Sequence, residues 1–330
     1  MFLLLRFPAD SRQPEGLLWL PLQAIAIAKT ENNLRFEGVN LGSMANLMLS
    51  EGQVEEAAAL YTKALNIAKQ VGDRKSEGTT LGNLAYLQRD LGQVEAAETN
   101  FKLALQIARE VGGRRGEGIT LANLAGLQRN QGKRKESLRN YKKAVKIAQE
   151  VGNKRGEAIT LRNIADLQIE EKAFEEAHTN LDRTLTISQE INNDVLRGKA
   201  FGSLARLLYA QGQHDAAIPY LKKAIAICER SHPITAGIYG GTLALIQAQK
   251  GLFDEARKLL DTGETSLKTT SKVEYGKLLC KKAEILQMAE LPGAIEALEE
   301  AEIIASDMGG NAVSELSLAI EESRARMSQD

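Results

Sequence analysis

Apolar residues recur along this chain at spacings of three and four, in blocks separated by short polar or glycine-containing segments. One helical face of the block from 78 to 90 is apolar and is made by Leu81, Leu84, Ala85 and Leu87. The block from 94 to 111 has the same spacing, in Ala97, Phe101, Ala104, Leu105 and Ala108. Gly92 stands between the blocks, where a left-handed residue can end a helix. The pattern predicts a hairpin of two amphipathic helices.

This hairpin returns every forty residues. The segments that begin at Thr80, Thr120 and Thr160 read TLGNLAYLQRD, TLANLAGLQRN and TLRNIADLQIE. A fixed period of this length is typical of stacked repeats, in which each unit packs only on its neighbours. The six prolines and 5% aromatic residues also favour helices over β-sheet. The sequence therefore predicts an all-α solenoid, and the usual work of such a surface is to hold other proteins.

Small residues recur at three positions of the repeat. Ala85 and Ala97 are predicted to lie where the two helices cross, and Ala104 to face the following hairpin. A large side chain at such a crossing would overpack it. The same trio recurs at Ala45, Ala57 and Ala64, and at Ala205, Ala217 and Ala224. The turn glycine also recurs, except that residue 172 is lysine, so that one turn must form without glycine.

These alanines, with Phe101 or Tyr61 four residues after Ala97 or Ala57, resemble the tetratricopeptide repeat family. The resemblance covers about residues 35–308. It departs from the family in having leucine at the usual tryptophan position and 40 residues per unit rather than about 34. The long unit is similar to those of spindle-orientation adaptors, bacterial regulators and kinesin light chains. The resemblance implies a right-handed superhelical α-solenoid that binds protein segments in a concave groove.

The period divides the chain into four parts. Residues 1–16 follow no period and are predicted to be flexible; 17–34 form an incomplete repeat with the second helix only; 35–308 form seven repeats; and 309–330 form a C-terminal capping helix. The apolar stretch 17–28 could also pass for a signal peptide. The period argues against that reading, because Ala24, Ile27 and Ala28 precede Ala64, Ile67 and Ala68 by forty residues.

The resemblance implies that the first helix of each unit lines the groove. The predicted peptide-binding residues are Asn46, Asn83, Tyr86, Arg89, Asn123, Arg129, Arg162, Asn163, Asp166, Lys199, Ser203, Arg206 and Tyr209. An asparagine amide both donates and accepts, so a row of them can pair with an extended backbone. Arginines can grip carboxylates, which favours an acidic segment. Two alternatives stay open: the asparagines bond a neighbouring helix, or the arginines pair with Asp90, Asp166 and Glu170.

Net charge is −1, which gives the whole chain no bias toward nucleic acid or a membrane. The charge is nevertheless uneven. Residues 73–162 hold 18 Lys/Arg and 10 Asp/Glu, whereas residues 283–330 hold 2 and 11. Cys228 and Cys280 follow no disulfide or zinc motif, so a reducing cytoplasm is the expected location. No metal-ligand spacing, phosphate loop or cofactor motif is recognisable, and no enzymatic activity is expected.

The sequence thus predicts a non-enzymatic scaffold or adaptor that binds an extended, acidic protein segment. One alternative is a self-assembly module, or part of a larger signalling protein, that stacks through the open N-terminal half repeat. A third hypothesis is a regulator whose basic centre holds its own acidic tail. Fold does not decide among these functions.

Overall fold

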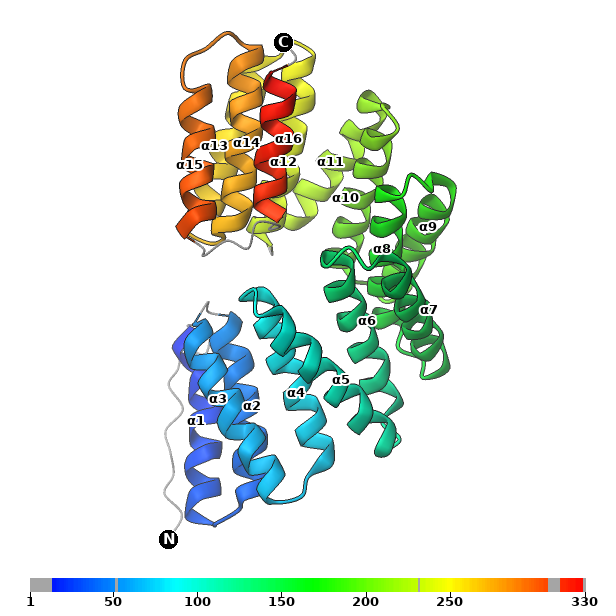
Figure 1. The fold of residues 1–330 in the computed structure, drawn as a ribbon, viewed down its shortest axis with the longest axis vertical. Helices are drawn as coiled ribbons and strands as arrows, with labels where there is room; N and C mark the ends of the chain where they lie inside the picture. Colours follow the sequence, from blue (N-terminus) through cyan, green and yellow to red (C-terminus); the bar gives the residue numbers. More distant parts are fainter. Residues whose placement is uncertain (1–13, 51–52, 231, 308–314, 329–330) are drawn as a thin grey trace. The chain divides into compact units, whose positions relative to one another are not determined.

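The structure is a computed structural model that describes residues 14–50, 53–230, 232–307 and 315–328, and all its regular secondary structure within them is helical (Figure 1). It comprises two compact units, residues 1–153 and 154–330. Unit 1 contains α1 (Pro14–Thr30), α2 (Leu34–Ser50), α3 (Val54–Gln70), α4 (Arg74–Asp90), α5 (Val94–Glu110), α6 (Arg114–Asn130) and α7 (Arg134–Glu150). Unit 2 contains α8 (Lys154–Glu170), α9 (Phe174–Glu190), α10 (Asp194–Ala210), α11 (His214–Cys228), α12 (Pro233–Gln249), α13 (Phe253–Leu267), α14 (Lys272–Met288), α15 (Ala294–Asp307) and α16 (Glu315–Met327).

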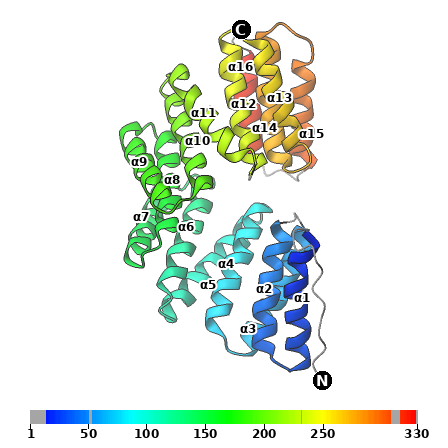
Figure 2. The ribbon, with the colours of Figure 1, turned by 180° about the vertical axis from the view of Figure 1, so that it is seen from behind.

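Consecutive helices pair as antiparallel hairpins. In unit 1 the pairs are α2/α3, α4/α5 and α6/α7, and α1 packs against α2. In unit 2 the pairs are α8/α9, α10/α11, α12/α13 and α14/α15, and α16 packs against α14 (Figure 2). Each hairpin also packs on the next within its unit, as α3 does on α4 and α11 on α12. The predicted fold class, an α-solenoid of tetratricopeptide-type hairpins, is confirmed.

The predicted small residues lie at the helix crossings. Ala45, Ala57, Ala85 and Ala97 are fully buried, with no exposed surface. In α7 the same position is Ser137, whose hydroxyl donates to the carbonyl oxygen of Ala125 at 2.7 Å. A side-chain oxygen can reach the partner helix's backbone only where the two backbones approach closely. This position therefore accepts only small side chains.

The turns between helices repeat one left-handed residue. Gly92 adopts φ +72° and ends α4, as the sequence predicts. Lys172 adopts φ +60° at the corresponding place between α8 and α9. A residue with a Cβ is disfavoured there, so this turn carries a conformational cost that glycine would avoid. The repeat geometry is thus maintained by packing even where the turn residue is unfavourable.

Ion pairs repeat along one end of the hairpins. Arg74 at the start of α4 contacts Glu77 at 2.7 Å and Glu110 at the end of α5 at 2.5 Å. Glu117, one period after Glu77, accepts from Arg109 of the preceding hairpin at 2.9 Å. Glu117 is only 8% exposed, yet the arginines lie half in solvent, so each pair contributes modestly. The ladder joins the two ends of a hairpin and links it to the next.

The terminal predictions meet the structure only in part. Residues 14–16, which the sequence analysis assigns to a flexible segment, form the first turn of α1; the rest of that segment lies outside the described residues. Helix α16 falls within the predicted capping segment 309–330, of which 309–314 and 329–330 also lie outside them. No helix in the described parts of the chain is long and apolar enough to cross a bilayer.

Candidate functional site

In unit 1 the predicted binding residues lie on the first helices α2, α4 and α6. Asn46 of α2 is exposed, but its amide oxygen accepts from the Tyr61 hydroxyl of α3 at 2.6 Å. One of its hydrogen-bonding atoms is therefore engaged inside its own hairpin. For Asn46, the alternative that the amide bonds a neighbouring helix holds.

Asn83 of α4 and Asn123 of α6 differ from Asn46. Both are half-buried, and neither side chain has a hydrogen-bond partner among the residues that the structure describes. They stand forty residues apart, at the same register of two neighbouring first helices. An amide left in this state can both donate to and accept from a bound backbone. Unit 1 therefore presents two amides available to a ligand.

An arginine and a tyrosine stand beside these amides. The Arg89 guanidinium lies over the Tyr86 ring, 4.2 Å from its centroid, on the same helix. One Arg89 nitrogen also reaches α6, where a Cβ on Gly126 would lie 3.8 Å from it. Arg129 is half-buried on α6. Stacking on Tyr86 holds the Arg89 guanidinium plane in place.

A hollow of roughly 330 Å³ opens between α2, α3 and α4 of unit 1. Its apolar part comes from α3 and its polar part from the two first helices. The lining includes Ala64, Ile67 and Ala68 of α3, Val71 directly after it, and Gly42, Ser43, Asn46, Thr80 and Asn83 of α2 and α4. Two predicted residues, Asn46 and Asn83, therefore border a concave site.

In unit 2, Asp166 of α8 lies between two arginines. Arg162 donates to one carboxylate oxygen of Asp166 at 2.8 Å, and Arg206 of α10 contacts the other. Asp166 is only 5% exposed. Arg162 also donates to the amide oxygen of Asn163 at 2.8 Å. For Arg162 and Arg206 the structure supports the alternative of pairing within the protein, so neither offers a full charge to an acidic ligand.

Lys199 of α10 has no anionic partner among the described residues. Burial lowers the pKa of its ammonium, and the nearby charges of Arg162 and Arg155 lower it further. A carboxylate arriving beside Lys199 would relieve both repulsions. Among the predicted binding residues of unit 2, Lys199 is therefore the cation that can pair with a ligand carboxylate, since Arg162 and Arg206 already pair with Asp166.

Two predicted residues of unit 2 take part in helix packing. Ser203 is buried, with 6% of its surface exposed, so its hydroxyl is not presented at a surface. The Tyr209 ring stacks on His214 at the start of α11, with centroids 4.5 Å apart. Tyr209 also packs against the core around Leu221 and Ile246. Helix packing, which sequence position alone does not reveal, assigns both residues to the fold.

Sequence reasoning missed two residues of this region. The Tyr239 ring of α12 rests directly on Gly202 of α10: a Cβ there would lie 2.1 Å from the ring. Burial raises the pKa of the Tyr239 phenol. Lys281 of α14 donates to the Thr242 hydroxyl of α12 at 2.9 Å. The repeat register could have indicated both, since α12 and α14 are each the first helix of a hairpin.

Comparison with known proteins identifies the family of the fold. A tetratricopeptide repeat model matches residues 38–110, 116–190 and 157–230, which together make up more than half of the chain. The chain belongs to the tetratricopeptide repeat family. No curated protein matches it.

Solved tetratricopeptide-like structures share the fold at low sequence identity. The apo form of RapI is 16% identical, with a TM-score of 0.62, over 88% of this chain and 99% of that one. The Rap conjugation gene regulator of plasmid pLS20, solved with the Phr* peptide, is 12% identical, with a TM-score of 0.65, over 88% and 78%. BtubC from P. vanneervenii is 20% identical, with a TM-score of 0.56, over 68% and 95%. At these identities the likeness shows the fold alone.

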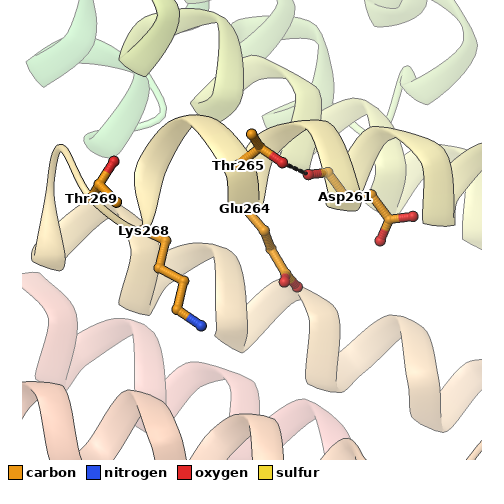
Figure 3. A pocket seen from close by; sticks show the side chains of 5 residues that line it. All are labelled: Asp261, Glu264, Thr265, Lys268 and Thr269. Atoms are coloured by element: carbon orange, nitrogen blue, oxygen red, sulfur yellow. Dashed lines mark hydrogen bonds between the residues drawn. The ribbon is translucent and has the colours of Figure 1, made fainter.

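A second hollow in this tetratricopeptide repeat protein lies along α13 and its C-terminal end (Figure 3). Its polar groups are engaged locally. Thr265 donates to the Asp261 carbonyl at 2.9 Å, and Glu264 pairs with Lys282 at 2.5 Å. One helix supplies all the lining residues, so they do not converge on a common point. The described residues also contain no group of His, Cys, Asp and Glu arranged to hold a metal.

Lys281 is expected to make the stability of these repeats to unfolding depend on pH. Burial lowers its pKa from 10.5 to about 8, against the opposing charges of Glu274 and Glu284. Between these two values the unfolded chain binds the proton and the folded chain does not, so stability rises with pH across this window. We expect Lys281→Met to stabilise the protein at pH 7 by about 2 kcal/mol, after allowance for residual solvent contact.

Urea unfolding of wild type and Lys281→Met at pH 7 and pH 9.5 measures this effect. The difference between the two proteins should shrink at the higher pH, because the wild-type lysine is then neutral when folded. Lys282 supplies the control, because it lies beside Lys281 on α14 and pairs with Glu264 of α13 at 2.5 Å. Lys282→Met should show no such convergence, and a Lys281→Met difference that is independent of pH would contradict the assignment.

Proposed function

We propose that this protein is a non-enzymatic binding module that holds an extended protein segment along its first helices. The observation that carries the proposal is the pair of unengaged amides, Asn83 and Asn123, at one register of neighbouring helices. Family membership supports it, because tetratricopeptide repeats stack to form extended binding surfaces. The pLS20 regulator, of similar fold, was solved with a peptide bound.

The segment is proposed to be acidic. In unit 1, Arg89 is held by stacking on Tyr86. Arg129 occupies the equivalent position of α6, forty residues later. In unit 2, Lys199 has no anion beside it, whereas Arg162 and Arg206 are already paired with Asp166. Arg89 and Arg129 also interact within the protein, so the charge preference rests chiefly on Lys199. Electrostatic attraction of this kind should weaken as salt is added.

Removing the two amides tests the proposal. Peptides selected from a random display library on the wild-type protein provide the ligand, and their affinities are measured by calorimetry. We expect Asn83→Ala/Asn123→Ala to weaken binding about 5- to 150-fold, since two hydrogen bonds of about 0.5–1.5 kcal/mol each are lost. Thermal stability should change little, because neither amide has a partner in the fold.

Asn66→Ala is the matched control, because Asn66 is an exposed asparagine on the second helix α3. Its affinity should equal that of wild type. Equal affinity of the double variant and wild type would overturn the groove assignment, and an equal loss in Asn66→Ala would show that the effect is not specific to the first helices.

Self-association remains the second proposal. Helices α1 and α2 expose Leu20, Leu22, Ile27, Phe36 and Val39, each at 43% or more. Exposed large apolar side chains on two paired helices can mark a protein interface. Light scattering on the same wild-type preparation decides it: a concentration-dependent mass together with no selected peptide would favour self-association over segment binding.

A further inference from the structure

Four first helices have a glycine on the side that faces the first helix of the next hairpin. It is found three residues before the alanine of the helix crossing, at Gly42, Gly82, Gly202 and Gly241. The residue that faces it stands five before the corresponding alanine of the next hairpin. These facing residues are Thr80, Thr120, Tyr239 and Leu278.

In unit 2 the chain's own side chains fill the space over the glycine. A Cβ on Gly202 would lie 2.1 Å from the Tyr239 ring, and one on Gly241 would lie 2.5 Å from Leu278. Such contacts are too short for any side chain, so only glycine permits them. The Tyr239 ring therefore shows what fits this position when a large side chain is supplied.

In unit 1 the equivalent space over Gly42 is open. A Cβ there would have nothing within 4 Å. The residue at the register of Tyr239 is here the short Thr80, which also lines the hollow. At Gly82 a Cβ would touch only the Thr120 hydroxyl at 3.9 Å and Ala104 at 4.0 Å. The 330 Å³ hollow lies at Gly42, and Gly82 is not among its lining residues. Glycine inside a helix is unfavourable relative to alanine, and no contact within the protein requires it at Gly42.

One side of this hollow can receive an aromatic ring. Ala64, Ile67, Ala68 and Val71 provide an apolar floor, and Ser43 and Asn83 provide polar groups at the edge. Arg35, Asp73 and Lys75 also line the hollow, and Arg35 pairs with Asp73 at 3.2 Å. The volume exceeds the cavity of about 150 Å³ that is known to take a benzene ring. A flat ring can lie against a glycine backbone, as Tyr239 does at Gly202, while a phenol group can reach the polar edge.

We propose that the hollow at Gly42 binds an aromatic side chain, tyrosine or phenylalanine, of the segment held along the first helices. This inference rests on the proposed function and adds a sequence requirement to it. Asn83 borders the hollow and is also one of the two unengaged amides. One ligand residue can thus place its side chain in the hollow while its backbone meets the Asn83 amide.

The full-length protein with methyl-labelled isoleucine tests the inference by NMR. N-acetyl-L-tyrosinamide and N-acetyl-L-phenylalaninamide are the probes, and N-acetyl-L-leucinamide is the aliphatic comparison. We expect saturable shifts of the Ile67 methyl resonance with both aromatic probes, at concentrations at least tenfold lower than with the leucine probe. No saturable shift at Ile67, or equal binding of the leucine probe, would overturn the aromatic assignment.

Two variants fill the hollow independently. Gly42→Leu places a side chain where nothing lies within 4 Å, so folding should be retained. Thr80→Tyr places a ring at the register at which Tyr239 covers Gly202. Each should weaken probe binding at least tenfold without lowering the melting temperature. Gly82→Ala, at the same register one hairpin later, is the control and should bind the probes as wild type does.

The outcome separates this inference from the proposed function. If Gly42→Leu keeps full affinity for the selected peptides and for the aromatic probes, the aromatic site is wrong. The groove proposal then still stands on the Asn83→Ala/Asn123→Ala result. If instead only the aromatic probes bind and the amide variant has no effect, the hollow is a site and the amides are not.

Discussion

Replacing Asp166 with alanine is expected to destabilise unit 2 by about 3 kcal/mol. The carboxylate is 5% exposed and lies between the Arg162 and Arg206 guanidinium groups. Removing one partner of a buried ion pair costs about 3–5 kcal/mol, because the remaining charges lose their compensation. We expect the lower end, since about 45% of the Arg206 side chain remains in solvent and can rehydrate. Urea unfolding followed by circular dichroism measures the change.

An exposed carboxylate on the next helix provides the control for this prediction. Asp182 of α9 pairs with His178 at 3.0 Å, but both side chains are more than half exposed. Asp182→Ala should therefore leave the unfolding midpoint almost unchanged. If Asp166→Ala were equally harmless, the two arginines would be free to bind an acidic ligand. The pairing would then not limit the charge available to a partner.

Replacing Ala57 with leucine is the second large effect, a loss of about 3 kcal/mol of stability in unit 1. Ala57 has no exposed surface and packs among Ala45, Met48 and Tyr61 at the crossing of α2 and α3. Three additional carbons must displace one helix from the other, and overpacking of this kind costs about 1–3 kcal/mol, occasionally more. We expect the upper end because both helices meet there through alanine.

Ala59, two residues further along α3, is exposed and makes the matched control. Alanine and leucine have similar helix propensities, so Ala59→Leu should change stability by less than about 0.5 kcal/mol. Thermal and urea unfolding of both variants separate packing from propensity. Similar destabilisation by both substitutions would show that helix content, and not the crossing, is what the alanines provide.

The hairpins themselves could be predicted from sequence because their causes are local. The 3–4 spacing of apolar residues specifies the helices, and the alanine trio specifies where they cross. The turn at Lys172 was also predictable as a turn without glycine, since the period places it there; the structure adds its left-handed backbone, φ +60°. Period and small residues together were sufficient for the family and the fold class.

The candidate site could be predicted only as a row of positions. Asn46, Asn83 and Asn163 occupy one side of first helices and look alike in sequence. The structure distinguishes them, because Asn46 accepts from Tyr61 and Asn163 accepts from Arg162. Asn83 has no side-chain hydrogen bond within the described chain. Which amide is available depends on its partner, which is Tyr61 of the next helix for Asn46 and the adjacent Arg162 for Asn163, and a repeat register does not name either.

The sequence by itself determined the period, the helices and the close crossings, because each follows from residues within one hairpin. Tertiary structure decided which groups remain for a ligand. Gly42 and Gly202 share one register, yet Thr80 leaves the first open while Tyr239 covers the second. Asp166 likewise pairs with Arg206 one period later. Both outcomes depend on the packing of one first helix against the next, which places side chains forty residues apart in contact.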